Sequence, residues 1–274
     1  MKQNLALKIA QCEDFCTLIK NNTNNTHGCS KIIDVQLSNK EVKEYHLPEP
    51  FSGDIYNAPI LFLSSNPSIS HSELYPTDSW PDNMITDFFV NRFKQREEDN
   101  SWVHKNKPLK KSGERGKSVR YWSSINKRAE ELLNRKAIAG EDYCITEIVH
   151  CKSEKEVGVS EAQNYCSDKF LKDMIKMSGA KVIIGIGKFV KNNLKSVDKL
   201  HGKPIYYLPH PNAFEKKTFA KVYEEKELKK IKDFLKDFNK ECKRDLSKYD
   251  LPMDEEVMEF IAIATSYKIL NKIK

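Results

Sequence analysis

The sequence lacks the marks of a membrane or secreted protein. No apolar run approaches the ~20 residues that a membrane-spanning helix needs. Residues 1–18 contain scattered charged and polar side chains and no long apolar stretch, which argues against a secretory signal. The seven cysteines are odd in number and irregularly spaced, and this argues against a disulfide framework. We therefore expect a cytoplasmic protein in a reducing compartment.

Two further patterns are missing. The sequence has no internal repeat, and the segment GIGK at residues 185–188 lacks the spacing and the Ser or Thr of a Walker phosphate loop. This excludes a P-loop nucleotide hydrolase. We expect Gly187 to form a tight turn from strand to helix that lets the backbone approach a ligand.

Length and composition indicate a single soluble domain. The chain has 274 residues, of which 39% are hydrophobic and 31% charged, with a net charge of +7. The charge favours a polyanionic partner, although a soluble protein can carry it with no partner at all. We expect one domain over residues 1–274, with an insertion at 68–120 and a helical C-terminal extension at 214–274. Nothing implies a protein partner, so we expect a monomer.

Four short apolar runs predict buried strands. They are residues 58–64 (APILFLS), 143–149 (YCITEIV), 181–186 (KVIIGI) and 203–208 (KPIYYL). Helical patterns lie between them at 124–134, where Ile125, Ala129, Leu132 and Leu133 share a face, and at 160–177. Strands that alternate with helices predict an α/β fold, a three-layer α/β/α sandwich with a central, four-stranded, mainly parallel sheet.

Polar or small residues follow all four runs. The tips read SSNPS at 64–68, HC at 150–151, GIGK at 185–188 and PHPN at 209–212. Taken singly, each is ordinary turn chemistry. Together they converge on the crevice at the carboxyl ends of the strands, where open parallel sheets bind ligands. His210 lies between two prolines that restrict its backbone, as a preorganised electrophile or base requires, although an isolated histidine is more often structural.

These tips resemble the signature motifs of a known family. SSNPS after the first strand and HPN after the last resemble the two motifs of the uracil-DNA glycosylase superfamily. The block between them, from ITEIVHC through IIGIGKFV, resembles its iron–sulfur type. The resemblance covers residues 58–213, apart from the insertion. It implies base excision: a flipped nucleotide, hydrolysis of its N-glycosidic bond and no covalent enzyme intermediate.

The resemblance also assigns roles to individual residues. Asn66 would orient the attacking water, and His210 would donate a hydrogen bond to the departing base. Ser65 and Pro67 would contact the substrate. The DNA contacts would come from Ser68, Gly187, Lys188 and Asn212, the last of which replaces the serine that is common in the family.

Glu147 departs from the pattern most clearly. Relatives that read uracil carry an asparagine here, whose amide both donates and accepts. A carboxylate only accepts, so it suits a base with an exocyclic amino group, as in cytosine. The alternatives are that Glu147 points elsewhere or is protonated. The sequence therefore favours a modified cytosine, such as the glucosylated hydroxymethylcytosine of phage DNA that some antiviral members excise, over plain uracil.

The insertion offers aromatic and basic side chains. Phe88 and Phe89 stand among aromatic residues that could stack a base, although any one of them is more often core. The basic stretch 104–120 contains Lys110, Lys111 and Arg115, which we expect to follow the DNA backbone; the alternative is a solvated loop.

The cysteines leave two interpretations open. Cys151 and Cys166 match two cluster ligands of the iron–sulfur branch, and Cys12 and Cys16 could complete a [4Fe–4S] site. The first pair is spaced C-x3-C where the branch has C-x2-C, and this departure favours buried free cysteines. We expect no cofactor to be required for catalysis.

The sequence therefore predicts a monofunctional DNA glycosylase acting on an aberrant or modified pyrimidine. Two alternatives belong to other classes. The first is a catalytically inactive nucleic-acid-binding module with the same fold. The second is a hydrolase of free nucleosides, against which the basic charge counts.

Overall fold

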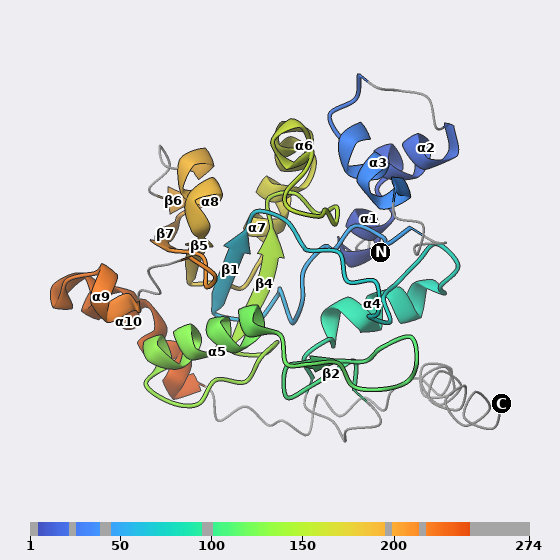
Figure 1. Cartoon of the computed structure of the whole chain (residues 1–274). Coiled ribbons are helices and arrows are strands. Elements are labelled where there is room, and N and C mark those ends of the chain that lie inside the picture. Colours follow the sequence, from blue (N-terminus) through green and yellow to red (C-terminus); the bar gives the residue numbers. More distant parts are fainter. Residues whose placement is uncertain are drawn as a thin grey trace.

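A central β-sheet with helices on both faces forms the body of the molecule (Figure 1). The computed structural model describes residues 5–21, 26–38, 45–94, 101–194, 199–213 and 218–241. Of the expected C-terminal extension at 214–274, residues 214–217 and 242–274 lie outside the described residues. Within the described part of the chain, no helix is both long enough and apolar enough to span a membrane.

The sheet contains five strands in the order β4-β1-β5-β7-β6. Their bounds are β1 Ile60–Ser64, β4 Tyr143–Glu147, β5 Val182–Ile186, β6 Lys199–Leu200 and β7 Lys203–Leu208. The first four in this order pair in parallel, and β6 pairs antiparallel with β7. All four expected strands are confirmed, but the expected count of four is wrong. Strand β6 has only two residues, so it leaves no apolar run in the sequence.

Helices cover both faces of this sheet. On one face, side chains of Leu61, Leu63 and Ile183 share a core with helices that precede β1, lie in the insertion between β1 and β4, or follow β4 and β5. These helices are α1 Leu5–Ala10, α2 Glu13–Asn21, α3 Ser30–Ser38, α4 Asp82–Val90, α6 Val159–Cys166, α7 Lys172–Met177 and α8 Gly187–Leu194. On the other face lie α5 Arg120–Leu133, α9 Phe219–Val222 and α10 Glu225–Glu241. The arrangement is compatible with the expected three layers, and it explains why the strands are apolar on both faces.

The expected helices form, with shifted ends. In α5, Ile125, Ala129, Leu132 and Leu133 are all buried, as their spacing predicts, but the helix begins earlier, at Arg120. The expected helix at 160–177 is α6 and α7 joined by a π-helical turn, Ser167–Leu171.

The insertion contributes most of its aromatic side chains to the core on the first of these faces. It contains α4 and the short hairpin of β2 Val103–His104 and β3 Lys107–Pro108. Phe88 and Phe89 are 1% and 0% exposed and pack edge-to-face against Tyr75 and each other, and Phe88 also contacts Trp80 and Trp102. The expectation that Phe88 and Phe89 contact the substrate is therefore wrong, because both rings are buried and pack against other aromatic side chains of the insertion.

Candidate active site at the carboxyl ends of the strands

The tips of the parallel strands meet at one edge of the sheet. Ser64 at the end of β1 stands beside Glu147 at the end of β4, and Ile186 of β5 stands beside Leu208 of β7. Strand β4, which follows β1 among the strands of this sheet, pairs with one side of β1, and β5 pairs with the other side of β1. Such a reversal of strand order is where open α/β sheets bind ligands. The edge therefore collects the residues that the sequence singled out.

His210 is held as a hydrogen-bond donor. The backbone N–H of Asn212 donates to its Nδ1 (3.2 Å), so in the neutral ring the proton is carried by Nε2. Burial lowers the pKa of His210, while Glu156 acts in the opposite direction. Gly187 adopts a φ of 90°, and a Cβ added there would lie 3.5 Å from the Cβ of His210, so the β5 turn approaches this side chain closely. A neutral imidazole that donates through Nε2 suits a group that stabilises developing negative charge.

Tyr121, in the first turn of α5, joins the tips of β1 and β7. Its ring stacks on that of His210 with centroids 5.6 Å apart and 20° between the planes. Its hydroxyl shares a short hydrogen bond with Ser64 Oγ. Beside His210, a small pocket is lined by residues of α5 and of the β5 and β7 tips, Ser124 and Arg128 among them. Tyr121 could not be predicted from the sequence, because no local pattern distinguishes it from the other aromatic residues near the insertion.

The loop that follows β1 presents Asn66. Its Nδ2 donates to the carbonyl oxygen of Pro67 (3.0 Å), which orients the amide and leaves Oδ1 as the acceptor for a water. Asn66 is half-buried, whereas Pro67 is buried and shapes the loop from within. The position suits the expected role of Asn66 and shows Pro67 as a structural residue of this loop.

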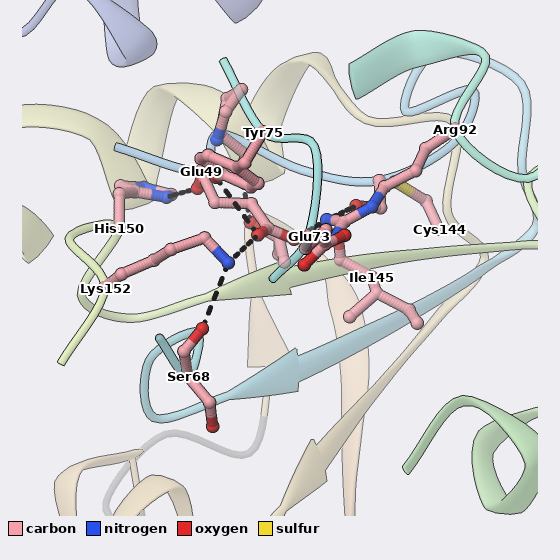
Figure 2. Close-up of polar contacts among 12 residues, drawn as sticks. Glu49, Ser68, Glu73, Tyr75, Arg92, Cys144, Ile145, His150 and Lys152 are labelled. Atoms are coloured by element: carbon pink, nitrogen blue, oxygen red, sulfur yellow. Dashed lines mark hydrogen bonds and ion pairs between the residues drawn. The ribbon is translucent and has the colours of Figure 1, made fainter. Parts of the chain in front are cut away.

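The segment that follows β4 holds this loop in place. Ser153 N–H donates to the carbonyl oxygen of Pro67 (3.1 Å), and Lys152 Nζ donates to that of Ser68 (3.0 Å; Figure 2). Ser65 Oγ donates to Glu156 Oε1 (2.7 Å). Lys152 and Glu156 could not be identified from the sequence, since their segment has the composition of a polar, solvated loop.

A buried ionic network lies behind the site (Figure 2). The guanidinium of Arg92 contacts Glu49 and Glu73, each at 2.6 Å, and Lys152 Nζ lies 3.5 Å from Glu49. Tyr75 and Ser52 also donate to Glu49. Burial alone would raise the pKa of Glu49, but Arg92 and Lys152 together hold it below its usual value. The network joins the insertion to the sheet and, through Lys152, to the loop of Asn66.

Glu147 lies beside this network, and among the described residues its carboxyl group makes no ion pair with it. It is 4% exposed, and its Oε2 has no hydrogen-bond partner among the described residues. Burial and then the nearby carboxylate of Glu49 raise its pKa well above the usual range, against the opposing pull of Arg92 and Lys152. Two cations already face two carboxylates here, so a third negative charge would be unbalanced. The protonated form, which the sequence left as an alternative, is therefore the form that the site favours.

The residues expected to bind DNA differ in how exposed their side chains are. Lys188, Asn212, Ser68 and Lys111 have exposed side chains. Lys110 is half-buried. Arg115 donates to the carbonyl oxygen of Trp102 (3.3 Å) and to Ser101 Oγ (3.2 Å), so it supports the insertion from within. These two hydrogen bonds give Arg115 a structural role that does not depend on DNA binding.

Four cysteines line one buried pocket. Cys12 lies between α1 and α2, Cys29 directly before α3, Cys151 after β4 and Cys166 at the end of α6. Burial, then the thiols of Cys166, Cys29 and Cys12, raise the pKa of Cys151, which reflects how close the four thiols lie. The N–H of His150 donates to Cys166 Sγ (3.4 Å). Four cysteine sulfurs are the donor set of an iron–sulfur cluster.

Cys16, which the sequence grouped with Cys12, Cys151 and Cys166, does not line this pocket, whereas Cys29 does. Among the described residues, no three His, Cys, Asp or Glu side chains converge closely enough to hold a metal ion. In a [4Fe–4S] cluster each cysteine binds a different iron, so the four sulfurs surround a volume and do not converge on a point. Four cysteine sulfurs around one pocket are the donors that such a cluster uses, and four thiolates can also hold a zinc ion.

No family model and no curated protein matches this sequence. The function must therefore be inferred from the geometry of the site and from the residues of the strand tips.

Proposed function

We propose that this protein is a monofunctional DNA glycosylase that hydrolyses the N-glycosidic bond of an aberrant or modified pyrimidine and leaves an abasic site. The observation that carries the proposal is the state of His210. Its Nδ1 accepts from Asn212 N–H, and burial lowers its pKa, so a neutral ring presents Nε2–H at the strand tips beside the Asn66 loop. A fixed neutral donor suits a departing base that gains negative charge.

The chemistry follows from charge development. The target nucleotide must leave the stack before side chains can reach its glycosidic bond. As the bond breaks, its electron pair moves to the base, where His210 Nε2–H donates to a carbonyl oxygen. A water oriented by Asn66 Oδ1 then adds to C1′ of the sugar. Asn66 is neutral and cannot take the proton, so it positions the water and does not act as a base.

A neutral Glu147 changes the expected base preference. A protonated carboxyl group has one donor and one acceptor. It can donate to N3 of cytosine and accept from the N4 amino group, or accept from N3–H of uracil and donate to O4. The edge of the base therefore excludes neither pyrimidine, and both modified cytosine and uracil belong to the proposal.

A panel of DNA substrates tests the function. The panel contains uracil, hypoxanthine, unmodified cytosine, hydroxymethylcytosine and glucosylated hydroxymethylcytosine, and alkali-induced strand breaks report abasic sites. We expect breaks in one or more of the uracil and modified-cytosine substrates and none in hypoxanthine or unmodified-cytosine DNA. Glu147→Gln, which retains one donor and one acceptor, should keep the base preference of the wild type.

Other outcomes have distinct meanings. Intact DNA throughout the panel, with tight DNA binding, would favour the catalytically inactive binding module. Cleavage of free nucleosides but not of DNA would favour a nucleoside hydrolase. Loss of activity in Glu147→Gln alone would show that Glu147 acts as a carboxylate.

The proposal includes a structural cofactor. We propose that Cys12, Cys29, Cys151 and Cys166 hold a [4Fe–4S] cluster, supported by their position around one pocket and by the N–H donated to Cys166. The cluster would join the N-terminal helices to the segment that follows β4, and no step of base excision passes through it. Its role would be to stabilise the fold on the side that carries Lys152.

Cys29→Ser and Cys16→Ser form a matched pair that tests the ligand set. Protein purified without oxygen should contain iron and show the broad visible absorption of a cluster. We expect Cys29→Ser to lose most of both, because a cluster ligand is removed, and Cys16→Ser to keep both. A wild type that contains zinc or no metal, or an equal loss in the two variants, would contradict this assignment.

A further inference from the structure

Glu156 places a carboxylate at the entrance to the site. Its Oε1 accepts a hydrogen bond from Ser65 Oγ (2.7 Å), one residue before Asn66. Its charge also acts on His210, at the tip of β7. The side chain is exposed, and its other carboxylate oxygen is available to a ligand. Glu156 thus lies between the two loops whose residues would handle the water and the base.

The backbone around Glu156 is held in an uncommon conformation. Lys155 and Glu156 have φ angles of 53° and 61°, in the left-handed region that residues other than glycine rarely adopt. Ser153 Oγ bonds the carbonyl oxygen of Val157 (2.6 Å), and Val159 N–H bonds that of Glu156 (3.2 Å). Ser153 also bonds Pro67, so this strained turn is fastened to the Asn66 loop. The carboxylate is therefore fixed relative to Asn66.

We propose that Glu156 is a further catalytic residue, which supplies the negative charge and the proton acceptor that Asn66 lacks. This inference rests on the proposed function. As the C1′–N bond breaks, its electron pair goes to the base and positive charge develops on the sugar, where a carboxylate is stabilising. The water oxygen forms the new bond to C1′, and its proton passes to the free oxygen of Glu156. Ser65 acts as a positioning residue, because its hydroxyl holds the other oxygen.

Glu156→Gln and Glu154→Gln test the role of the charge. Both glutamates are exposed residues of the same turn, but Glu154 pairs with Lys155 on the surface. We expect Glu156→Gln to lower kcat on the cleaved substrate by about 10²–10⁴-fold, because the proton acceptor is lost. DNA binding should be retained, because the variant only removes a negative charge near the phosphates. Glu154→Gln should keep the wild-type rate. Added formate should restore part of the activity of Glu156→Ala, which a purely structural role would not produce.

A second measurement does not need a substrate. Among the described residues, the polar and charged groups around His210 are Tyr121, Ser124 and Arg128 on α5, Asn212 on its own loop, and Glu156. Because Glu156 raises the pKa of His210, its replacement by glutamine should lower that pKa in an NMR titration, and Glu154→Gln should change it less.

The outcomes separate this inference from the proposed function. An active wild type with an equally active Glu156→Gln, or an unchanged pKa of His210, would overturn the role of Glu156 and leave the glycosylase intact. A wild type that makes no abasic site on any substrate would overturn both, whatever the titration shows.

Discussion

Replacing His210 by alanine is expected to slow abasic-site formation by about 10²–10³-fold, the usual cost of removing one donor to a developing negative charge. Burial lowers the pKa of the ring and Asn212 N–H occupies Nδ1, so the variant removes a neutral Nε2–H donor. Single-turnover cleavage of the best substrate in the panel measures this effect. DNA binding, measured by fluorescence anisotropy, should change little, because the residues that we expect to contact phosphates are others.

His201→Asn is the matched control. His201 is exposed in the turn before β7, whereas His210 follows the end of the same strand, so β7 separates the two side chains. Asparagine tolerates the positive φ of 50° at this position. The control should cleave at the wild-type rate. Equal rates for His210→Ala and the wild type would remove His210 from the mechanism and favour a different donor.

Replacing Arg92 by methionine is expected to lower the free energy of unfolding by about 3–5 kcal/mol, because it leaves buried carboxylates without their partner. Arg92 is 2% exposed and contacts both Glu49 and Glu73 at 2.6 Å. It also lies over the rings of Phe88 and Trp122, each at 5.0 Å. Urea denaturation of the purified variant measures the change.

Two variants show whether the unpaired charge is the cause. Lys236→Ala removes an exposed partner of Asp233 on α10 and should cost less than about 1 kcal/mol. The triple variant of Arg92→Met, Glu49→Gln and Glu73→Gln removes the charges together and should recover part of the loss. A stable single variant would mean that water or rearrangement compensates both carboxylates.

The network also connects stability to the site. Lys152 contacts Glu49 in the network and donates to the carbonyl oxygen of Ser68 in the Asn66 loop. Arg92 joins the same carboxylate to the insertion. The insertion therefore supports the loop that presents Asn66, a role that its buried phenylalanines serve by packing.

Local patterns predicted the four longer strands of the sheet and two of the helical segments. Continuous apolar runs marked β1, β4, β5 and β7, and the spacing of Ile125, Ala129 and Leu132 marked α5. The polar tips were also readable, since parallel strands bring their carboxyl ends to one edge. Strand β6 was missed because pairing of two residues is decided by the neighbouring strand and not by their own composition.

By itself, then, the sequence determined the parallel strands, the helical segments of α5 and of α6 with α7, and the edge that carries Asn66, Glu147 and His210. Only the tertiary structure decided what these residues are chemically. Burial beside Glu49 favours a neutral Glu147, packing within the insertion occupies Phe88 and Phe89, and folding brings Cys29 to Cys151 across more than a hundred residues of chain. The physical reason is that secondary structure follows from neighbours along the chain, whereas protonation, access and convergence depend on neighbours in space.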